Sequence, residues 1–308
     1  MKKFKVLIFG SKGLVGSSLH HYLQKSEKVS LVIPSTRKDT DLKNKNDIKN
    51  IIEKHQPDYV VNCAAKVGGI YANNTFRSEF LIDNLKINLN LFDVIKNYQN
   101  LSVINLGSSC IYPLNATNPI KECSFLEGKL EPTNSPYAIA KITGIELGRE
   151  IQNQYGNNVI NLMPTNLYGP NDNFTDMNSH VIPGLIFRMH KAKQDKQNTF
   201  KIWGSGTPLR EFMYVDDLSS CIEFLIGKKP KEDLINVGTG EEISILDLAL
   251  LLKEIIDFDG LIETNANMPD GNPRKLLDSS KINDLGWKSS IDLKSGLIKT
   301  YQWYLNHL

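Results

Sequence analysis

A glycine-rich turn early in the chain separates an apolar segment from a helical one. Lys5–Phe9 is a short apolar run that leads directly into Gly10-Ser11-Lys12-Gly13-Leu14-Val15-Gly16, and a helical pattern follows. Glycines at such a turn allow a tight bend, close approach of the backbone to a pyrophosphate and close packing of the helix on the strand. The helix N-terminus adds free N–H groups and the positive end of its dipole. The segment therefore predicts a dinucleotide-binding site.

Apolar strands alternate with helical segments through the first half of the chain. The predicted strands are Val6–Phe9, Leu31–Ile33, Tyr59–Ala64, Val103–Leu106 and Val159–Met163. The predicted helices are Leu14–Lys25, Ile48–His55, Glu79–Asn97 and Tyr137–Tyr155. This alternation predicts an α/β fold with a doubly wound parallel sheet of the Rossmann type. Ligands of such sheets bind at the carboxyl ends of the strands.

The pattern becomes less regular after Thr165, where segments rich in glycine and proline alternate with short helices. We expect residues 1–165 to form the cofactor-binding domain, with about 212–238 returning to it. Residues 166–308 should then form a smaller C-terminal lobe that closes over the cofactor domain and binds the substrate.

The residues after the second strand bear on the choice of cofactor. NAD enzymes usually carry Asp or Glu at that strand end to bind the ribose diol, whereas this chain continues Pro34-Ser35-Thr36-Arg37-Lys38. Arg37, together with Lys12, can contact a 2′-phosphate, which favours NADP(H) over NAD(H). The alternative is a pair of solvated surface cations. Asp39 and Asp41 come late for the diol, and Asp41-Leu42 is expected beside the adenine.

A tyrosine and a lysine stand four positions apart at Tyr137 and Lys141, so they share one face of a helix. A positive charge beside the phenol lowers its pKa and makes it an acid that can protonate an alkoxide near neutral pH. Ser108 follows the apolar run Leu101–Leu106 and can hydrogen-bond to the same oxygen. With a nicotinamide cofactor as hydride source, these residues predict the reduction of a carbonyl group.

Composition restricts the remaining classes of function. The chain has 308 residues, and its 36 basic and 34 acidic side chains leave a net charge of +2, which gives no reason to expect a nucleic acid or membrane partner. No apolar stretch is long enough to span a bilayer. The four cysteines, Cys63, Cys110, Cys123 and Cys221, lack metal-ligand spacing. We therefore expect a cytoplasmic enzyme without a bound metal.

Longer segments around these motifs show a resemblance to a known family. They are Ala64–Ile70, Asn73–Thr75, Leu106–Pro113, Leu130–Asn134, Met163–Pro170, Asn178–Pro183 and Pro208–Phe212. Through them the chain resembles the extended short-chain dehydrogenase/reductases and, among these, the GDP-L-fucose synthase family. Two departures stand out: Leu14 occupies a position where Met is usual, and the turn Pro34–Arg37 looks about one residue longer than in the family.

The resemblance implies two chemistries in one pocket. It makes Ser108, Tyr137 and Lys141 the reductase triad, with Lys141 also holding the nicotinamide ribose. It implies that Cys110 is a base and His180 an acid for inverting C3 and C5 of a GDP-4-keto-6-deoxy sugar before C4 is reduced. Both protons are alpha to the ketone, so the groups that bind its oxygen also stabilise an enolate.

The resemblance also implies sets of binding residues. For NADP(H) they are Gly10, Ser11, Lys12, Gly13, Leu14, Val15, Gly16, Thr36, Arg37, Asp41, Leu42, Ala64, Ala65, Lys141, Pro164, Asn166, Leu167 and His180. For the GDP-sugar they are Ser108, Ser109, Cys110, Arg188, Trp203, Arg210, Arg274 and Asp278. The arginines are expected to neutralise the diphosphate and Trp203 to stack on the base. Relatives pair through the two helices expected at Glu79–Asn97 and Tyr137–Tyr155, which implies a homodimer.

Several alternatives remain open at this point. The same motifs fit a reductase that acts on a GDP-4-keto heptose or 3,6-dideoxyhexose epimerised by another enzyme. A non-catalytic NADP(H)-sensing module is a more distant alternative, because such proteins commonly lose the tyrosine or the lysine. A 4,6-dehydratase is disfavoured, since Ser109-Cys110 stands where that chemistry needs an acidic pair. Taken singly, a cysteine is more often a small core residue, and a lone histidine is more often structural.

Overall fold

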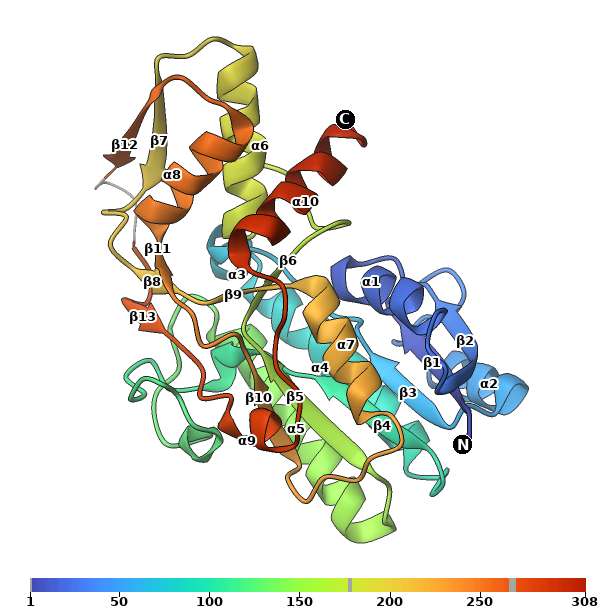
Figure 1. Cartoon of the computed structure of the whole chain (residues 1–308). Helices are drawn as coiled ribbons and strands as arrows, with labels where there is room; N and C mark the ends of the chain where they lie inside the picture. The colour runs from blue at the N-terminus through green and yellow to red at the C-terminus, as the bar shows by residue number, and fades with distance from the viewer. Residues whose placement is uncertain (1, 177–178, 266–269) are drawn as a thin grey trace.

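A six-stranded sheet forms the centre of the computed structural model, which describes residues 2–176, 179–265 and 270–308 (Figure 1). Asn178, one of the residues in the family resemblance, lies outside these ranges. The strand order is β10-β5-β4-β3-β1-β2, and every neighbouring pair is parallel. The strands are β1 (Phe4–Phe9), β2 (Val29–Ser35), β3 (Tyr59–Asn62), β4 (Ser102–Leu106), β5 (Val159–Pro164) and β10 (Leu234–Val237). The predicted α/β class with a parallel, doubly wound sheet is confirmed.

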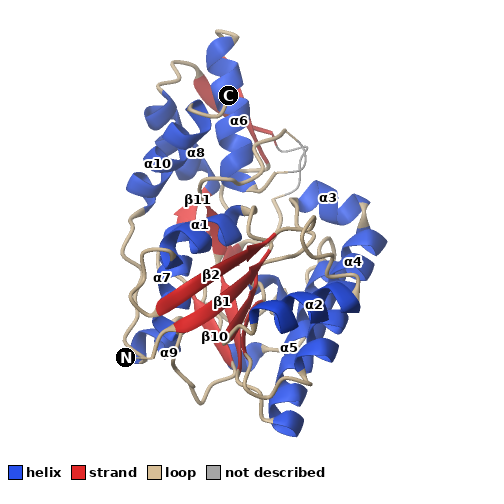
Figure 2. Ribbon diagram, turned by 90° about the vertical axis from the view of Figure 1, so that its right-hand side faces the viewer, coloured by secondary structure: helices blue, strands red, loops and turns tan. Residues whose placement is uncertain are grey.

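Helices cover both faces of this sheet (Figure 2). One face carries α1 (Leu14–Leu23) and α7 (Val215–Leu225), and the other carries α2 (Lys45–His55), α4 (Arg77–Ile95) and α5 (Ser135–Tyr155). Strand β1 contacts helices on both faces of the sheet. Val6 and Ile8 pack with the first set of helices, while Leu7 and Phe9 pack with the second. Alternate side chains of a strand point to opposite faces, so a strand buried on both faces must be apolar throughout.

Helix α5, which carries Tyr137 and Lys141 of the expected triad, begins where its sequence allows. Pro136 lies in the first turn of α5, where its missing N–H group costs nothing. Helix α5 lies along α4, and Asn88 of α4 donates a hydrogen bond of 2.8 Å to the Ala140 carbonyl. A side chain at Gly144 would collide with Asn88, so glycine at this position permits the close packing of α5 on α4.

A second lobe with its own core stands over the carboxyl ends of the strands (Figure 1). Its helices are α6 (Val181–Gln194), α8 (Ile245–Ile256) and α10 (Leu293–Leu305), beside the parallel pair β7 (Thr199–Trp203) and β12 (Leu261–Asn265). The remaining short elements are α3 (Ile70–Thr75), β6 (Asn166–Tyr168), β8 (Leu209–Arg210), β9 (Phe212–Tyr214), β11 (Ile243–Ser244), β13 (Arg274–Lys275) and α9 (Ser280–Asp284). Between the lobe elements, α7 and β10 return to the large sheet.

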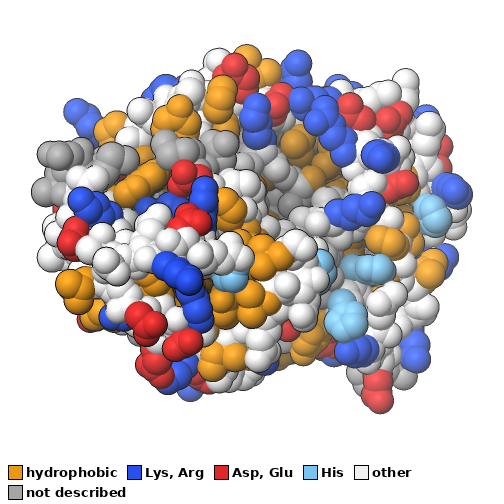
Figure 3. Space-filling view, turned by 90° about the horizontal axis from the view of Figure 1, so that it is seen from above, with side chains coloured by type: hydrophobic (Ala, Val, Ile, Leu, Met, Phe, Trp, Pro, Cys, Tyr) orange, Lys and Arg blue, Asp and Glu red, His pale blue; other side chains and the backbone are white. Residues whose placement is uncertain are grey.

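Basic and acidic side chains share the upper face of the molecule (Figure 3). Seen from above, basic and acidic side chains are interspersed over the visible face (Figure 3). No helix within the described ranges is long and apolar enough to cross a membrane.

Candidate active site

A cavity of about 990 Å³ opens at the carboxyl ends of the strands, between the large sheet and the lobe. Most of the site residues predicted from the sequence line this cavity. They are Gly10, Gly13, Leu14, Val15, Thr36, Arg37, Asp41, Leu42, Ala64, Ala65, Ser108, Ser109, Cys110, Tyr137, Lys141, Pro164, Asn166, Leu167, His180, Arg188, Trp203 and Arg210. Parallel strands bring their carboxyl ends to one edge, so residues far apart in the sequence meet there. Ser11, Lys12, Gly16, Arg274 and Asp278 do not line it.

The glycine turn is shaped by backbone contacts. Gly10 has φ +77°, a conformation that favours glycine, and a Cβ there would lie 2.9 Å from Ala64. A Cβ at Gly16 would lie 2.2 Å from the Gly10 carbonyl oxygen. Gly16 therefore serves the packing of α1 on the turn, whereas Gly13 faces the cavity.

The turn after β2 is held by a carboxylate. Asp39 Oδ2 accepts hydrogen bonds from the backbone N–H of Thr36 at 2.9 Å and from its hydroxyl at 2.6 Å. These hydrogen bonds lower the pKa of Asp39, and Lys12 contributes to the same effect. Asp39 is thus engaged in shaping the turn, and Arg37 is left on the lining of the cavity.

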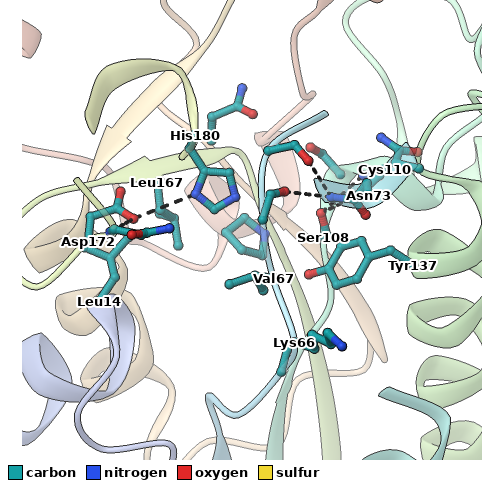
Figure 4. Close-up of a pocket in the computed structure, with 18 of the residues that line it drawn as sticks. Leu14, Lys66, Val67, Asn73, Ser108, Cys110, Tyr137, Leu167, Asp172 and His180 are labelled. Carbon is teal, nitrogen blue, oxygen red and sulfur yellow. Dashed lines mark hydrogen bonds and ion pairs between the residues drawn. The ribbon is translucent and has the colours of Figure 1, made fainter. Parts of the chain in front are cut away.

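Ser108 lies at the end of β4, where it precedes a short 3₁₀ turn, Ser109–Ile111. Its Oγ is 2.7 Å from the Cys110 Sγ (Figure 4). A hydrogen bond from Ser108 also acts to lower the pKa of Tyr137. A second thiol, Cys63, also lines the cavity, but burial raises its pKa to about 12 and keeps it protonated. Of these two thiols, Cys110 is the one that lies beside the hydroxyl group of Ser108, a member of the predicted reductase triad.

Tyr137 and Lys141 lie together on α5, as predicted, but their electrostatics differ from the prediction. Burial raises the pKa of Tyr137, and the charge of Cys110 raises it further, against the opposing hydrogen bond from Ser108. Lys141 is itself buried; its Nζ donates a hydrogen bond of 2.6 Å to the Leu106 carbonyl and lies 5.7 Å from the centre of the Tyr137 ring. The expected lowering of the pKa of Tyr137 is therefore wrong for this arrangement, because desolvation outweighs the distant ammonium.

His180 is the residue before α6, and its ring lies at the cavity. Its Nδ1 is 3.8 Å from the Asp172 Oδ1 (Figure 4). Asp172 also lines the cavity, and the side chain of Asp172 is only 6% exposed. Sequence reasoning missed Asp172, because no spacing rule links a residue after β6 to one eight positions later.

The lobe contributes cations and a tryptophan to the far end of the cavity. The Arg188 guanidinium lies over the Trp203 ring at 5.4 Å from its centre. Burial lowers the pKa of Arg188 and of Arg210, while nearby carboxylates act in the opposite direction. Arg274 instead forms an ion pair with Glu242 at 2.6 Å. Asp278 is held by a hydrogen bond of 2.9 Å from the Ser280 backbone N–H.

Lys275 is a further cation in the cavity that the sequence did not reveal. Burial lowers its pKa, with the charges of Cys110, Arg210 and Glu131 as smaller influences. The signal was ambiguous, since Arg274 and Lys275 are adjacent residues of the short strand β13 and successive side chains point to opposite faces. Within the described ranges, no group of three or more metal-ligating side chains is assembled.

A parallel Rossmann-type sheet, a glycine turn and a Ser–Tyr–Lys group at its carboxyl edge together define an extended short-chain dehydrogenase/reductase fold. Residues 6–238 match the NAD dependent epimerase/dehydratase family, and the chain belongs to it.

Several known proteins of this fold are similar to the chain over its full length. The chain is 44% identical over 307 residues to GDP-L-fucose synthase 1 of Arabidopsis thaliana, covering 100% of this chain and 95% of the relative. It is 32% identical to a crystal structure of a GDP-6-OMe-4-keto-L-xylo-heptose reductase from C. jejuni, with a TM-score of 0.92 and coverage of 100% and 99%. A GDP-L-fucose synthetase from Naegleria fowleri bound to NADP is 29% identical, with a TM-score of 0.91 and coverage of 100% and 94%.

Proposed function

We propose that this chain is an NADPH-dependent enzyme that inverts C3 and C5 of a GDP-4-keto-6-deoxy sugar and then reduces C4, as in the formation of GDP-L-fucose. The observation that carries the proposal is the meeting of Ser108, Cys110, Tyr137 and His180 on one cavity, in a chain with full-length similarity to a GDP-L-fucose synthase. Reduction alone needs neither the thiol nor the imidazole. Their presence beside the reductase group supports a proton-transfer step on the same sugar.

The lining of the cavity fits NADP(H). Gly10 and Gly13 leave room for a pyrophosphate at the start of α1, and Thr36 and Arg37 stand where a 2′-phosphate is expected. The Asp39 carboxylate is not free to bind the ribose diol as an acidic residue does in an NAD enzyme, because Thr36 already donates two hydrogen bonds to Asp39. A relative with the same fold has NADP bound. Bound NADPH supplies the hydride that reduces C4.

Reduction of C4 assigns distinct tasks to three residues. Tyr137 gives its phenolic proton to the developing alkoxide, and its raised pKa keeps that proton in place until it is needed. Ser108 hydrogen-bonds to the same oxygen. Lys141 holds the nicotinamide ribose, and its ammonium favours the phenolate that remains after proton transfer.

Epimerisation uses the same oxygen contacts. Removal of a proton alpha to the ketone places negative charge on the ketone oxygen, where Ser108 and Tyr137 stabilise it. The Cys110 thiolate takes the proton from one face of the ring, and His180 returns a proton to the other face. Figure 4 shows His180 on one side of the cavity and Cys110 on the other.

The lobe is the site we infer for the nucleotide. Arg188, Arg210 and Lys275 bring positive charge to the cavity for a diphosphate, and Trp203 offers an aromatic face to the base. This assigns residues 1–165 and about 212–238 to cofactor binding and 166–308 to the GDP-sugar. Arg274 and Asp278 stay predictions from the sequence, because the structure places them outside the cavity lining.

A second candidate is reduction without epimerisation. It is favoured by the likeness to a heptose reductase with a TM-score of 0.92. In that case the sugar arrives already epimerised, and Cys110 and His180 contribute contacts rather than proton transfer. We further infer a cytoplasmic homodimer, with α4 and α5 of each chain at the interface.

One experiment distinguishes the two candidate functions. The purified enzyme is given NADPH and GDP-4-keto-6-deoxymannose in deuterated water, and the product is identified by NMR. We expect GDP-L-fucose with deuterium at C3 and C5, and loss of turnover by about 10²- to 10⁴-fold in Tyr137→Phe with NADPH binding retained. NADPH oxidation without deuterium at either carbon would leave a reductase and remove the epimerase. Absence of any oxidation with a GDP-4-keto sugar would refute both.

A further inference from the structure

Asp172 and His180 form a pair at the edge of the cavity opposite the reductase group (Figure 4). Asp172 lies in the loop after β6, and His180 directly precedes α6. The Nδ1 edge of the imidazole faces the carboxylate, and the other edge faces the side where Ser108 and Tyr137 lie. The ring therefore stands between a carboxylate and the region where a sugar would bind.

The carboxylate of Asp172 is poorly compensated without His180. Its Oδ1 accepts a hydrogen bond of 2.8 Å from the Asn173 backbone N–H, but its Oδ2 is buried with no hydrogen-bond partner in the described part of the chain. Among the described residues, His180 is the basic side chain within ion-pair distance of this carboxylate. Removing a carboxylate from water costs several kcal/mol unless a positive charge compensates it. His180 is therefore the side chain placed to compensate the buried carboxylate.

The other charged side chains near the His180 ring pair with each other rather than with His180. Asp176 and Arg188, on the same loop and on α6, are paired with each other at 4.0 Å. Leu14 from α1 and Leu167 from β6 border the ring and carry no charge (Figure 4). Asp172 is therefore the carboxylate placed to act on His180.

We propose that Asp172 is a positioning residue that keeps His180 protonated and turned toward the sugar. The carboxylate faces Nδ1 at 3.8 Å, so the Nε2 edge of the ring is turned toward the cavity. In the proton-transfer step the electron pair of the enolate forms a C–H bond with the Nε2 proton while the N–H bond breaks. The ketone is restored, and the imidazole is left neutral beside the carboxylate. This inference rests on the proposed epimerisation and names the group that sustains its acid.

Asp172→Asn tests the pair because the amide keeps the shape and removes the charge. We expect deuterium incorporation at C3 or C5 from deuterated water to fall by about 10- to 100-fold. The alkaline limb of its pH profile should move to lower pH, because the imidazolium loses its negative partner. Reduction of an already epimerised GDP-4-keto sugar should fall much less, and Asp172→Glu should restore part of the exchange.

Two controls separate this role from a structural one. Asp195→Asn removes an exposed carboxylate at the other end of α6 and should leave the pH profile in place. In a His180→Gln background, Asp172→Asn should cause no further loss, and thermal unfolding should show that each variant is folded. Exchange at the wild-type rate with an unmoved profile in Asp172→Asn, or an equal further loss in the His180→Gln background, would overturn the pair. No exchange in the wild-type enzyme would instead overturn the proposed epimerisation, and the pair with it.

Discussion

At the scale of single residues, Lys141 shows how a catalytic side chain lowers stability. Burial lowers the pKa of its ammonium from 10.5 to about 8. Between these pH values the unfolded chain binds more protons than the folded one, so the free energy of unfolding rises as the pH rises. Below about pH 8 the ammonium is charged in both states, and the full cost of its desolvation remains.

We predict that Lys141→Met raises the free energy of unfolding at pH 7. The gain is at most roughly 3 kcal/mol from desolvation, reduced by about 1 kcal/mol for the lost hydrogen bond to the Leu106 carbonyl. The difference from wild type should shrink toward pH 10, while turnover is lost. Urea unfolding at pH 7 and pH 10 measures this, with the exposed Lys191→Met as control. Equal stability of both proteins at pH 7 would contradict it.

Individual residues were predictable where a spacing or a motif marks them. The four-residue interval of Tyr137 and Lys141 places both on one helix face, and the apolar run before Ser108 predicts a strand end. The same spacing gave the wrong direction for the pKa of Tyr137, because burial depth and the hydrogen bond to the Leu106 carbonyl are tertiary properties. Asp172 and Lys275 carry no such mark, and their approach to the cavity depends on how the lobe folds back.

At the scale of elements, the turn between β1 and α1 separates packing from ligand binding. A Cβ at Gly16 would meet backbone atoms of Gly10 at 2.2 Å, whereas a Cβ at Gly13 would make an ordinary van der Waals contact of 3.6 Å with the Gly10 carbonyl oxygen. We predict that Gly16→Ala lowers the melting temperature without any ligand, because neither backbone segment can move away cheaply. Gly13→Ala should melt near the wild-type temperature but bind NADPH more weakly, because Gly13 lines the cavity.

Thermal unfolding and NADPH titration of the two variants check this prediction. Equal loss of melting temperature in both would show that the turn acts as one packing unit, contrary to the geometry of Gly13.

Strands β1 to β5 of the large sheet were predictable from their own sequences, whereas the edge strand β10 was not among the predicted strands. Each central strand is buried on both faces, so its apolar run marks it, and the predicted ends lie close to those observed for β1 and β4. The lobe was not readable in this way. Strands β8, β11 and β13 have two residues each, too few for a periodic pattern, and pairing with one another fixes them.

At the scale of the whole molecule, an apolar stripe lies exposed along α4 and α5. Ile82 and Leu89, seven positions apart on α4, are 48% and 47% exposed, and Ile139 of the adjacent α5 is 45% exposed. Residues seven apart lie on one face of a helix. Apolar side chains grouped on adjacent elements commonly mark a contact with another protein. A second copy of the chain is the occupant we infer, through a four-helix interface.

We predict that the enzyme sediments at twice the 34.7 kDa mass of one chain and that Leu89→Glu shifts it to the monomer. A charge placed at the centre of an apolar interface would be buried without a partner, which costs several kcal/mol. Leu250→Glu is a matched control, because Leu250 is also 47% exposed but lies on α8 of the lobe. A monomeric wild-type enzyme, or a dimer that persists in Leu89→Glu, would contradict the assigned interface. Because α5 also carries Tyr137 and Lys141, a monomer with reduced turnover would further show that the second copy helps to hold the catalytic helix in place.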